Sequence, residues 1–167
     1  MAYQMKVDGM SEISEMLEKL GDSAQAVASK ALYEGAGIMA DSIRKGADTI
    51  RTAEFHYASN GDTRLPSPEE KEIVQAAAAG IAKFNKNGTE VDTSVGFRNA
   101  GYAELNGKMV PIPKIVNAIN SGTSFMNKQP FVRKAASSAT PKALEAMRKR
   151  IEEEFDAIGK QYQESMK

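Results

Sequence analysis

Few side chains in this sequence have the types and spacing that catalysis or metal binding requires. His56 is the single histidine and cysteine is absent, which excludes a histidine-centred triad, a multi-histidine metal site and thiol chemistry within one chain. Asn60-Gly61-Asp62 resembles a fragment of a calcium loop, but the further ligands at alternate positions and the closing glutamate are missing. We therefore expect no cofactor and no metal ion.

Two other polar groups also have simpler explanations than catalysis. The carboxylates between Glu152 and Asp156 would be spread around a helix axis beside Arg148 and Arg150, as on a solvated face. The run Ser-Gly-Thr-Ser at 121–124 offers hydroxyls, but no base stands at a recognisable place. The sequence has no phosphate-binding glycine loop and no Gly-x-Ser-x-Gly elbow. We therefore expect a protein that is not an enzyme.

A role with nucleic acid would depend on six cations in the last third of the chain. Nearby glutamates cancel much of their field, and lysine plus arginine equals aspartate plus glutamate at 22 each, so the summed charge gives no long-range attraction to DNA. Specific DNA recognition is thus the weaker hypothesis, and a nucleic-acid-associated accessory protein is kept as the alternative. The six cations are Arg133, Lys134, Lys142, Arg148, Lys149 and Arg150.

Length and composition indicate one globular domain over residues 1–167. Hydrophobic residues are 41% and charged residues 26%, which is ordinary for a folded domain. No stretch approaches the roughly 18 consecutive apolar residues that a membrane span needs, and the N-terminus has no basic region ahead of an apolar core. We expect neither a membrane span nor a secretory signal.

Periodicity predicts three elements in the first third of the chain. Apolar and polar residues alternate over 3–7, as in a half-buried strand, and Ser11 then caps a short helix that Gly21 ends. Apolar residues spaced by three and four predict a long helix over 22–51. A polar segment at 52–66 follows, which we interpret as an extended loop or arm, because connections of this length are commonly functional.

Two glycines in the long helix and two aromatic residues in the arm suggest contacts. The glycines suggest packing within the fold, and the aromatic residues suggest contact with a neighbouring copy. Gly35 and Gly37 cost up to about 1 kcal/mol each inside a helix, so we expect close packing against another element there rather than a bend. Phe55 and Tyr57 are the large apolar residues of the arm, and they would anchor it on a neighbouring copy.

The middle of the chain has strong local signals. Ser67-Pro68-Glu69-Glu70 is a capping box with proline at the first helical position, which predicts a helix that continues to Phe84. Alternation over 91–97 predicts the clearest strand. Asn106-Gly107 predicts a hairpin turn within 102–110, because both residues tolerate positive φ.

We call residues 119–135 the corner, because they join two apolar segments through a constrained connector. Pro113 opens a short helix, Gly122 stands where that helix needs positive φ, and Pro130 opens the next helix. Phe125 and Met126 between them either cover the core from outside or form a subunit contact.

A last helix is expected to start at Thr140-Pro141 and to carry an apolar stripe. This stripe can pack on a sheet or pair with a partner helix. The fold class that follows is α+β, with a small antiparallel sheet packed by a long N-terminal helix and a C-terminal amphipathic helix. The stripe consists of Leu144, Met147, Ile151, Phe155, Ile158 and Tyr162.

The corner also carries a resemblance to a known family. Ser-Gly-Thr-Ser at 121–124, followed by Gln-Pro-Phe-Val-Arg-Lys-Ala at 129–135, resembles the tail-completion (neck, head–tail joining) proteins of long-tailed bacteriophages. The opening at 5–13, the Val-Gly-Phe element at 95–97 and the C-terminal helix are similar in order. The region from Thr52 to Pro68 departs from the family, because it lacks the Pro-x-x-Thr-Gly-x-Leu segment of many members.

The resemblance implies a structural virion protein of the neck or tail, assembled in the host cytoplasm. It implies a homo-oligomeric ring, a hexamer or a dodecamer, that contacts the head connector and the tail terminator or tube proteins, with DNA only passing through. Two complementary patches would recur around such a ring, one at the corner and one on the arm. The expected interface residues are Phe55, Tyr57, Gly122, Thr123, Phe125, Met126, Pro130, Phe131 and Arg133.

Overall fold

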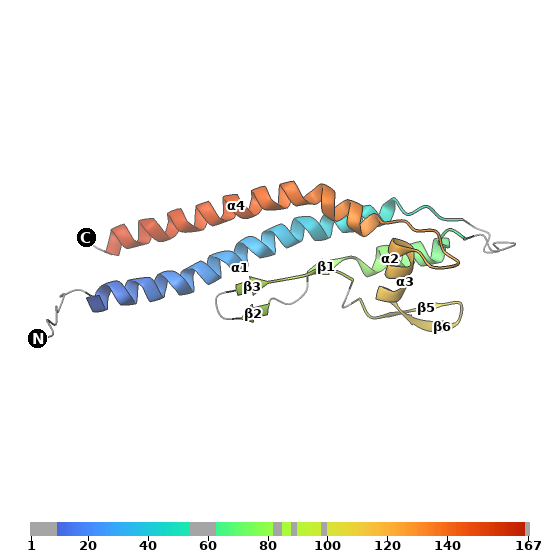
Figure 1. Ribbon diagram of the computed structural model, residues 1–167, viewed down its shortest axis with the longest axis horizontal. Coiled ribbons are helices and arrows are strands. Elements are labelled where there is room, and N and C mark those ends of the chain that lie inside the picture. The colour runs from blue at the N-terminus through green and yellow to red at the C-terminus, as the bar shows by residue number, and fades with distance from the viewer. Residues whose placement is uncertain (1–9, 54–62, 82–84, 88–89, 98–99, 166–167) are drawn as a thin grey trace, which may run out of the picture.

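The computed structural model describes residues 10–53, 63–81, 85–87, 90–97 and 100–165. Two long antiparallel helices, α1 (Met10–Asp48) and α4 (Phe131–Ser165), lie side by side (Figure 1). The strands and the two short helices lie along α1 and at the end of the molecule where α4 begins (Figure 1). The α+β class is confirmed. The predicted strand at 3–7 lies outside the described residues.

We call the two packed helices α1 and α4 the stem. Small residues form most of the contact between them. Buried residues recur about every fourth position on both helices, so each presents one narrow face to the other. A Cβ added at Gly35 would lie 2.5 Å from the sulfur of Met147, which confirms the close packing predicted there. Gly37 has no atom within 4 Å of such a Cβ, so the same prediction is wrong at that position. The buried residues of the contact are Val27, Ala31, Ala36, Ala40, Ile43 and Ala47 on α1, and Phe131, Ala135, Ala139 and Ala143 on α4.

Both stem helices are longer than the sequence predicts. Gly21 does not end α1, which continues from Met10, and a glycine cost of about 1 kcal/mol is small beside a helix this long. Pro141 lies inside α4 and does not start a new helix. Pro141 is exposed, while Ala139 and Ala143 on either side are buried, so packing on α1 continues past the missing N–H.

Charged residues also connect α1 and α4, beyond the stretch of small buried residues. The Glu154 carboxylate of α4 accepts hydrogen bonds from Lys30 Nζ of α1 at 2.7 Å and from Arg150 at 2.9 Å. The hydrogen bond from Lys30 is the main cause that holds the pKa of Glu154 below its usual value, against a smaller opposing effect of desolvation. Since both partners are screened by water, this link fixes alignment more than it stabilises the stem.

The strands form three separate antiparallel pairs among the described residues, where a single small sheet was expected. β1 (Gly80–Ile81) pairs with β4 (Val95–Gly96), and β2 (Asn85–Asn87) pairs with β3 (Glu90–Asp92). The strand predicted over 91–97 is therefore two short strands, separated at Thr93 and Ser94. The third pair is a hairpin, and its bounds are β5 (Tyr102–Leu105) and β6 (Lys108–Pro111).

Local turn and cap chemistry in the middle of the chain agrees with the sequence. In α2 (Pro68–Ala77), Ser67 and Glu70 make the reciprocal capping-box hydrogen bonds. Asn106 and Gly107 adopt φ of 52° and 72°, which confirms the hairpin turn. The helix does not reach Phe84, however. It ends at Ala77. The residues that follow are not helical, and Gly80 pairs with Gly96 in the first pair of strands.

The core lies where the stem meets α2, the hairpin and α3 (Ile112–Ser121). Val74 of α2 and Ile119 of α3 are fully buried there, in the same core cluster as Ile43 and Ala47 near the end of α1. Pro113 stands in the first turn of α3 as predicted, and Gly122 caps its end with φ of 78°. This core fixes the position of the corner, which passes over it from α3 to α4.

Candidate functional site

A tight turn within the corner exposes one large apolar side chain. Thr123 and Met126 exchange backbone hydrogen bonds, from N to O at 3.0 Å and 3.4 Å, and so close the turn. A Cβ at Gly122 would lie 3.2 Å from the backbone nitrogen of Lys128, so close approach as well as positive φ favours glycine there. Phe125 at the tip of the turn is 59% exposed. The turn therefore holds an aromatic ring in solvent on a fixed backbone.

The end of the arm is hydrogen-bonded to this turn. Arg64 N donates to Phe125 O at 2.9 Å, and Asn127 N donates to Arg64 O at 2.8 Å, in the manner of a short parallel bridge. The side chains of Thr63 and Asn127 also contact each other by a hydrogen bond. The corner and the end of the arm are thus one continuous surface of a single chain. The end of the arm that the structure describes, residues 63–66, therefore adjoins the corner, while the predicted anchors Phe55 and Tyr57 lie outside the described residues.

Gln129 holds the start of the arm to the same corner. Its side-chain Oε1 accepts from Arg51 N and its Nε2 donates to Arg51 O, both at 2.8 Å. Gln129 N donates to Ile119 O at 2.8 Å, which joins the corner to α3 as well. Because Gln129 is only 9% exposed, these bonds are shielded from water, and we call this arrangement the Gln129 clamp.

Replacing Gln129 by leucine tests the clamp. We expect Gln129→Leu to lower the free energy of unfolding by about 1–3 kcal/mol, because the Arg51 backbone loses both partners in a shielded place. Urea unfolding followed by circular dichroism measures this. The matched control is Gln75→Leu, because the Gln75 side chain is exposed and donates to the Asp48 carboxylate. We expect this variant to lower the free energy of unfolding by less than about 0.5 kcal/mol. Equal losses in the two variants would show that the clamp contributes nothing particular.

A partly buried ion pair connects the end of the arm to α2. The Arg64 guanidinium donates to both oxygens of the Glu70 carboxylate at 2.7 Å, and Glu70 also accepts from Ser67 N. The hydrogen bonds to Glu70 raise the pKa of Arg64 above its usual value, in opposition to partial burial. Arg64 therefore stays charged, and its fork connects the arm to the capping box of α2.

The residues predicted for a subunit interface divide into three groups. Met126 and Phe131 are 3% and 4% exposed and belong to the core, where the Phe131 ring meets the Phe97 ring edge-on at 6.3 Å. For these two the interface interpretation needs correction, because the Met126 side chain is buried in the core beneath the turn and Phe131, at the start of α4, is buried in the same core. Phe125, Thr123 and Arg133 are exposed, and Gly122 and Pro130 are half-buried. Phe55 and Tyr57 lie outside the described residues. The single histidine, His56, which was not predicted for the interface, also lies outside them.

Sequence reasoning missed the residues that fix the corner. The motif at 129–135 contains Gln129 but gives no indication of its role, and no sequence pattern points to Arg64. A nearly buried glutamine beside a proline gives no sequence signal of its partner, because Arg51 is far away along the chain. The capping-box motif predicts the hydrogen bond between Glu70 and the start of α2. The motif does not predict the ion pair that Glu70 also forms with Arg64.

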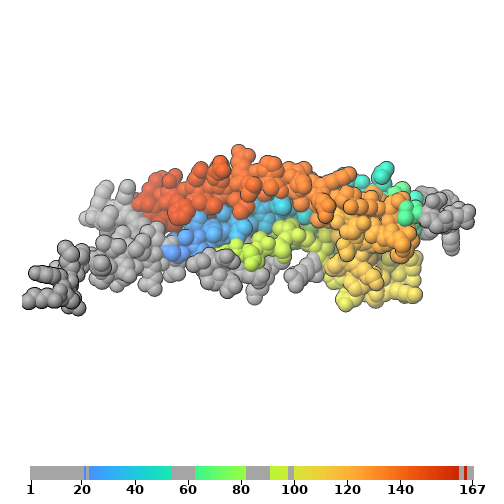
Figure 2. Space-filling view, viewed as in Figure 1, coloured from blue at the N-terminus to red at the C-terminus, as the bar shows by residue number. Residues whose placement is uncertain are grey.

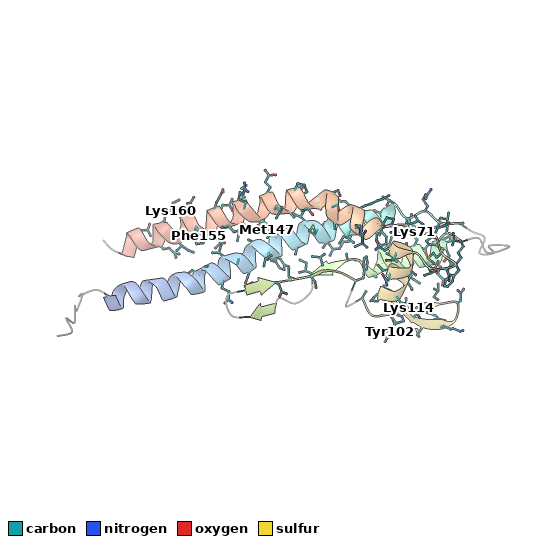
Figure 3. All side chains as sticks on the ribbon, in the orientation of Figure 1. Lys71, Tyr102, Lys114, Met147, Phe155 and Lys160 are labelled. Atoms are coloured by element: carbon teal, nitrogen blue, oxygen red, sulfur yellow. The ribbon has the colours of Figure 1, made fainter. Side chains whose placement is uncertain are left out.

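A further exposed apolar surface lies on the hairpin. Tyr102 and Met109 are each 66% exposed, and they share the outer face of β5 and β6 with Glu104 and Pro111. Figure 2 shows the hairpin and α3 in yellow to orange, as a mass projecting from one end of the elongated molecule. Tyr102 lies at the edge of this mass, away from the stem (Figure 3).

An apolar groove also opens beside the stem. It has a volume of about 320 Å³ and lies between α1, α4 and the segment from Thr93 to Val95. Met147 lines it, and Phe155 lies farther along α4 toward the C-terminus (Figure 3). Phe155 is 44% exposed and Leu144 is 58% exposed, so the predicted apolar stripe of α4 is only partly covered by α1.

The described residues offer little for chemistry. Within the ranges given above, no three His, Asp or Glu side chains are grouped as metal ligands would be. No helix in the described part of the chain combines the length and apolar character that a bilayer span needs.

Comparison with family models, with curated proteins and with solved structures finds no significant match.

Proposed function

We propose that this chain is a structural protein of a phage neck or tail, which completes the tail and joins it to the head connector. Copies would form a ring around the DNA conduit, as a hexamer or a dodecamer, and contact the tail terminator or tube proteins. The chain would act in the virion, after assembly in the host cytoplasm, and it would not be an enzyme. The proposal rests on the resemblance of residues 121–124 and 129–135, together with one structural observation.

That observation is the rigid presentation of Phe125. An exposed aromatic residue on a protein surface is common and needs no explanation alone. Here, however, the backbone on both sides is tied, by the turn from Thr123 to Met126 and by Arg64. A backbone held in place before binding loses less conformational entropy on association, which favours an assembly contact.

A ring built by rotation needs a second patch that is complementary to the first and lies elsewhere. Since the base of the arm adjoins the corner, the outer face of the hairpin is the better candidate for that second patch. Tyr102 and Met109 offer two large exposed side chains there, of the types enriched in interfaces. The stem supports a spacer role as well, because a helix of 35 residues is about 50 Å long at about 1.5 Å per residue.

Reconstitution tests the proposal. Purified chain is mixed with connector and tail-tube proteins from the same genome, and complexes are measured by light scattering and electron microscopy. We expect stoichiometric rings that bridge the two partners and do not form without this chain. Genes for a connector and a tail tube on either side of the coding sequence would add support. A chain that joins neither partner, under conditions in which those partners are folded, would contradict the proposal.

A further inference from the structure

A pocket between the end of α1 and the start of α4 collects positive charge. It has a volume of about 210 Å³, and its lining is mainly polar. Arg51, Lys128 and Lys134 line it, and all three are exposed. No lining residue is acidic, and none of the three cations forms an ion pair with another described residue. Asp48, just before this region, directs its carboxylate to Gln75 of α2.

The backbone beneath each cation is fixed. The Gln129 clamp holds Arg51 at both its N–H and its carbonyl. The Lys128 backbone lies close to Gly122, where a Cβ would be 3.2 Å from the Lys128 nitrogen, and Lys134 N donates to Pro130 O at 3.0 Å in the first turn of α4. The three positive groups are therefore brought together from three segments by the same contacts that form the corner. Their proximity is built into the fold.

Three cations without a carboxylate repel each other, and an anion in the pocket would relieve this repulsion. The start of α4 in the pocket wall adds the partial positive charge of a helix N-terminus. The Arg51 guanidinium and the two lysines provide the types of donor that phosphate oxygens accept from. An acidic peptide fits less well, because a peptide contact normally also needs an apolar anchor and this lining is mainly polar.

We propose that this pocket binds a phosphate group of a nucleic-acid backbone. The site belongs to a single chain and depends neither on a ring nor on the proposed role in a neck. Because the net charge of the protein is zero, attraction to DNA must come from a local group such as this one. In an assembled conduit it would be a point at which a subunit touches passing DNA.

The number of phosphate contacts determines the salt dependence. One neutralised phosphate gives a slope of log affinity against log salt of about −0.9, which is a loss of about three- to fourfold between about 50 and 200 mM salt. An accessory protein that grips DNA over about 6–10 phosphates would have a slope of about −5 to −9. The slope therefore separates this small site from the alternative function considered in the sequence analysis.

Fluorescence anisotropy of a short labelled duplex at low salt tests the site in the full chain. We expect the double variant Lys128→Gln/Lys134→Gln to bind about tenfold or more weakly, and its salt slope to become shallower by up to about 0.9. The matched control removes two exposed cations elsewhere on α4, as Lys142→Gln/Arg148→Gln, and should weaken binding by no more than about twofold. Circular dichroism confirms that both variants are folded.

Two further arms identify the source of the phosphate. Inorganic phosphate, followed by its ³¹P resonance, and polyglutamate are each added as competitors of the duplex. The proposal is supported if the duplex binds in a pocket-dependent manner and polyglutamate displaces it poorly. It is overturned if the two double variants lose the same affinity, if polyglutamate competes as well as unlabelled duplex, or if inorganic phosphate binds and the duplex does not.

Discussion

Phe125→Asp is expected to stop assembly while leaving the subunit folded. The side chain is 59% exposed, so a carboxylate at this position is solvated in the free subunit. In an interface the same charge would be desolvated without a partner, at a cost of several kcal/mol. A loss of about 3 kcal/mol lowers a contact affinity by about a hundredfold, and a ring repeats the contact in every subunit. The yield of joined complexes in the reconstitution assay measures the effect.

Two companion variants make this prediction sharper. Phe125→Leu keeps an apolar side chain, so it should retain most of the assembly. Reversal of the exposed charge in Arg133→Glu should also impair assembly without changing the circular dichroism spectrum. If Phe125→Asp assembles like the wild-type chain, the corner is not a subunit contact.

Phe131→Ala is expected to have the largest effect on stability. Phe131 is 4% exposed and packs on Phe97 and Gly46, where α4 meets the core. Removing a buried phenylalanine leaves a cavity and costs about 3–5 kcal/mol in the free energy of unfolding. Denaturant unfolding of the purified variant measures this loss.

Phe125→Ala is the matched control, because it makes the same chemical change a few residues away in the same corner. Its exposed side chain should contribute less than about 0.5 kcal/mol to the free energy of unfolding. A small loss for Phe125→Ala would show that Phe125 does not cover the core, which is one of the two interpretations that the sequence left open for Phe125 and Met126. If Phe131→Ala unfolds at the wild-type denaturant concentration, its assignment to the core is wrong.

Features that depend on neighbouring residues could be predicted from the sequence. The capping box at Ser67, the Asn106-Gly107 turn and the positive φ of Gly122 are all set by the conformational limits of one or two residues. The continuity of the helices could not be predicted, because it depends on packing. Gly21 and Pro141 weaken a helix locally, but both are exposed in helices whose opposite faces are packed elsewhere along their length.

The candidate site could be predicted only in outline for the same reason. The sequence placed the corner correctly, yet it could not tell which side of the turn each apolar side chain occupies. Phe125 faces solvent and Met126 faces the core, although they are adjacent and similar in hydrophobicity. The clamp on Arg51 joins residues that are remote in sequence, and no local pattern records such a pairing.

The stem has a consequence for the order in which the protein folds. Asp48 ends α1 and Phe131 begins α4, so nearly half of the chain lies between two helices that pack on each other. Closing a flexible loop of that length costs about 4 kcal/mol in entropy before any contact between the helices forms. If the intervening core forms first, it shortens this loop and brings the two helix ends together. We therefore expect the helices to zip together late, from the corner outward, with their far ends joining last.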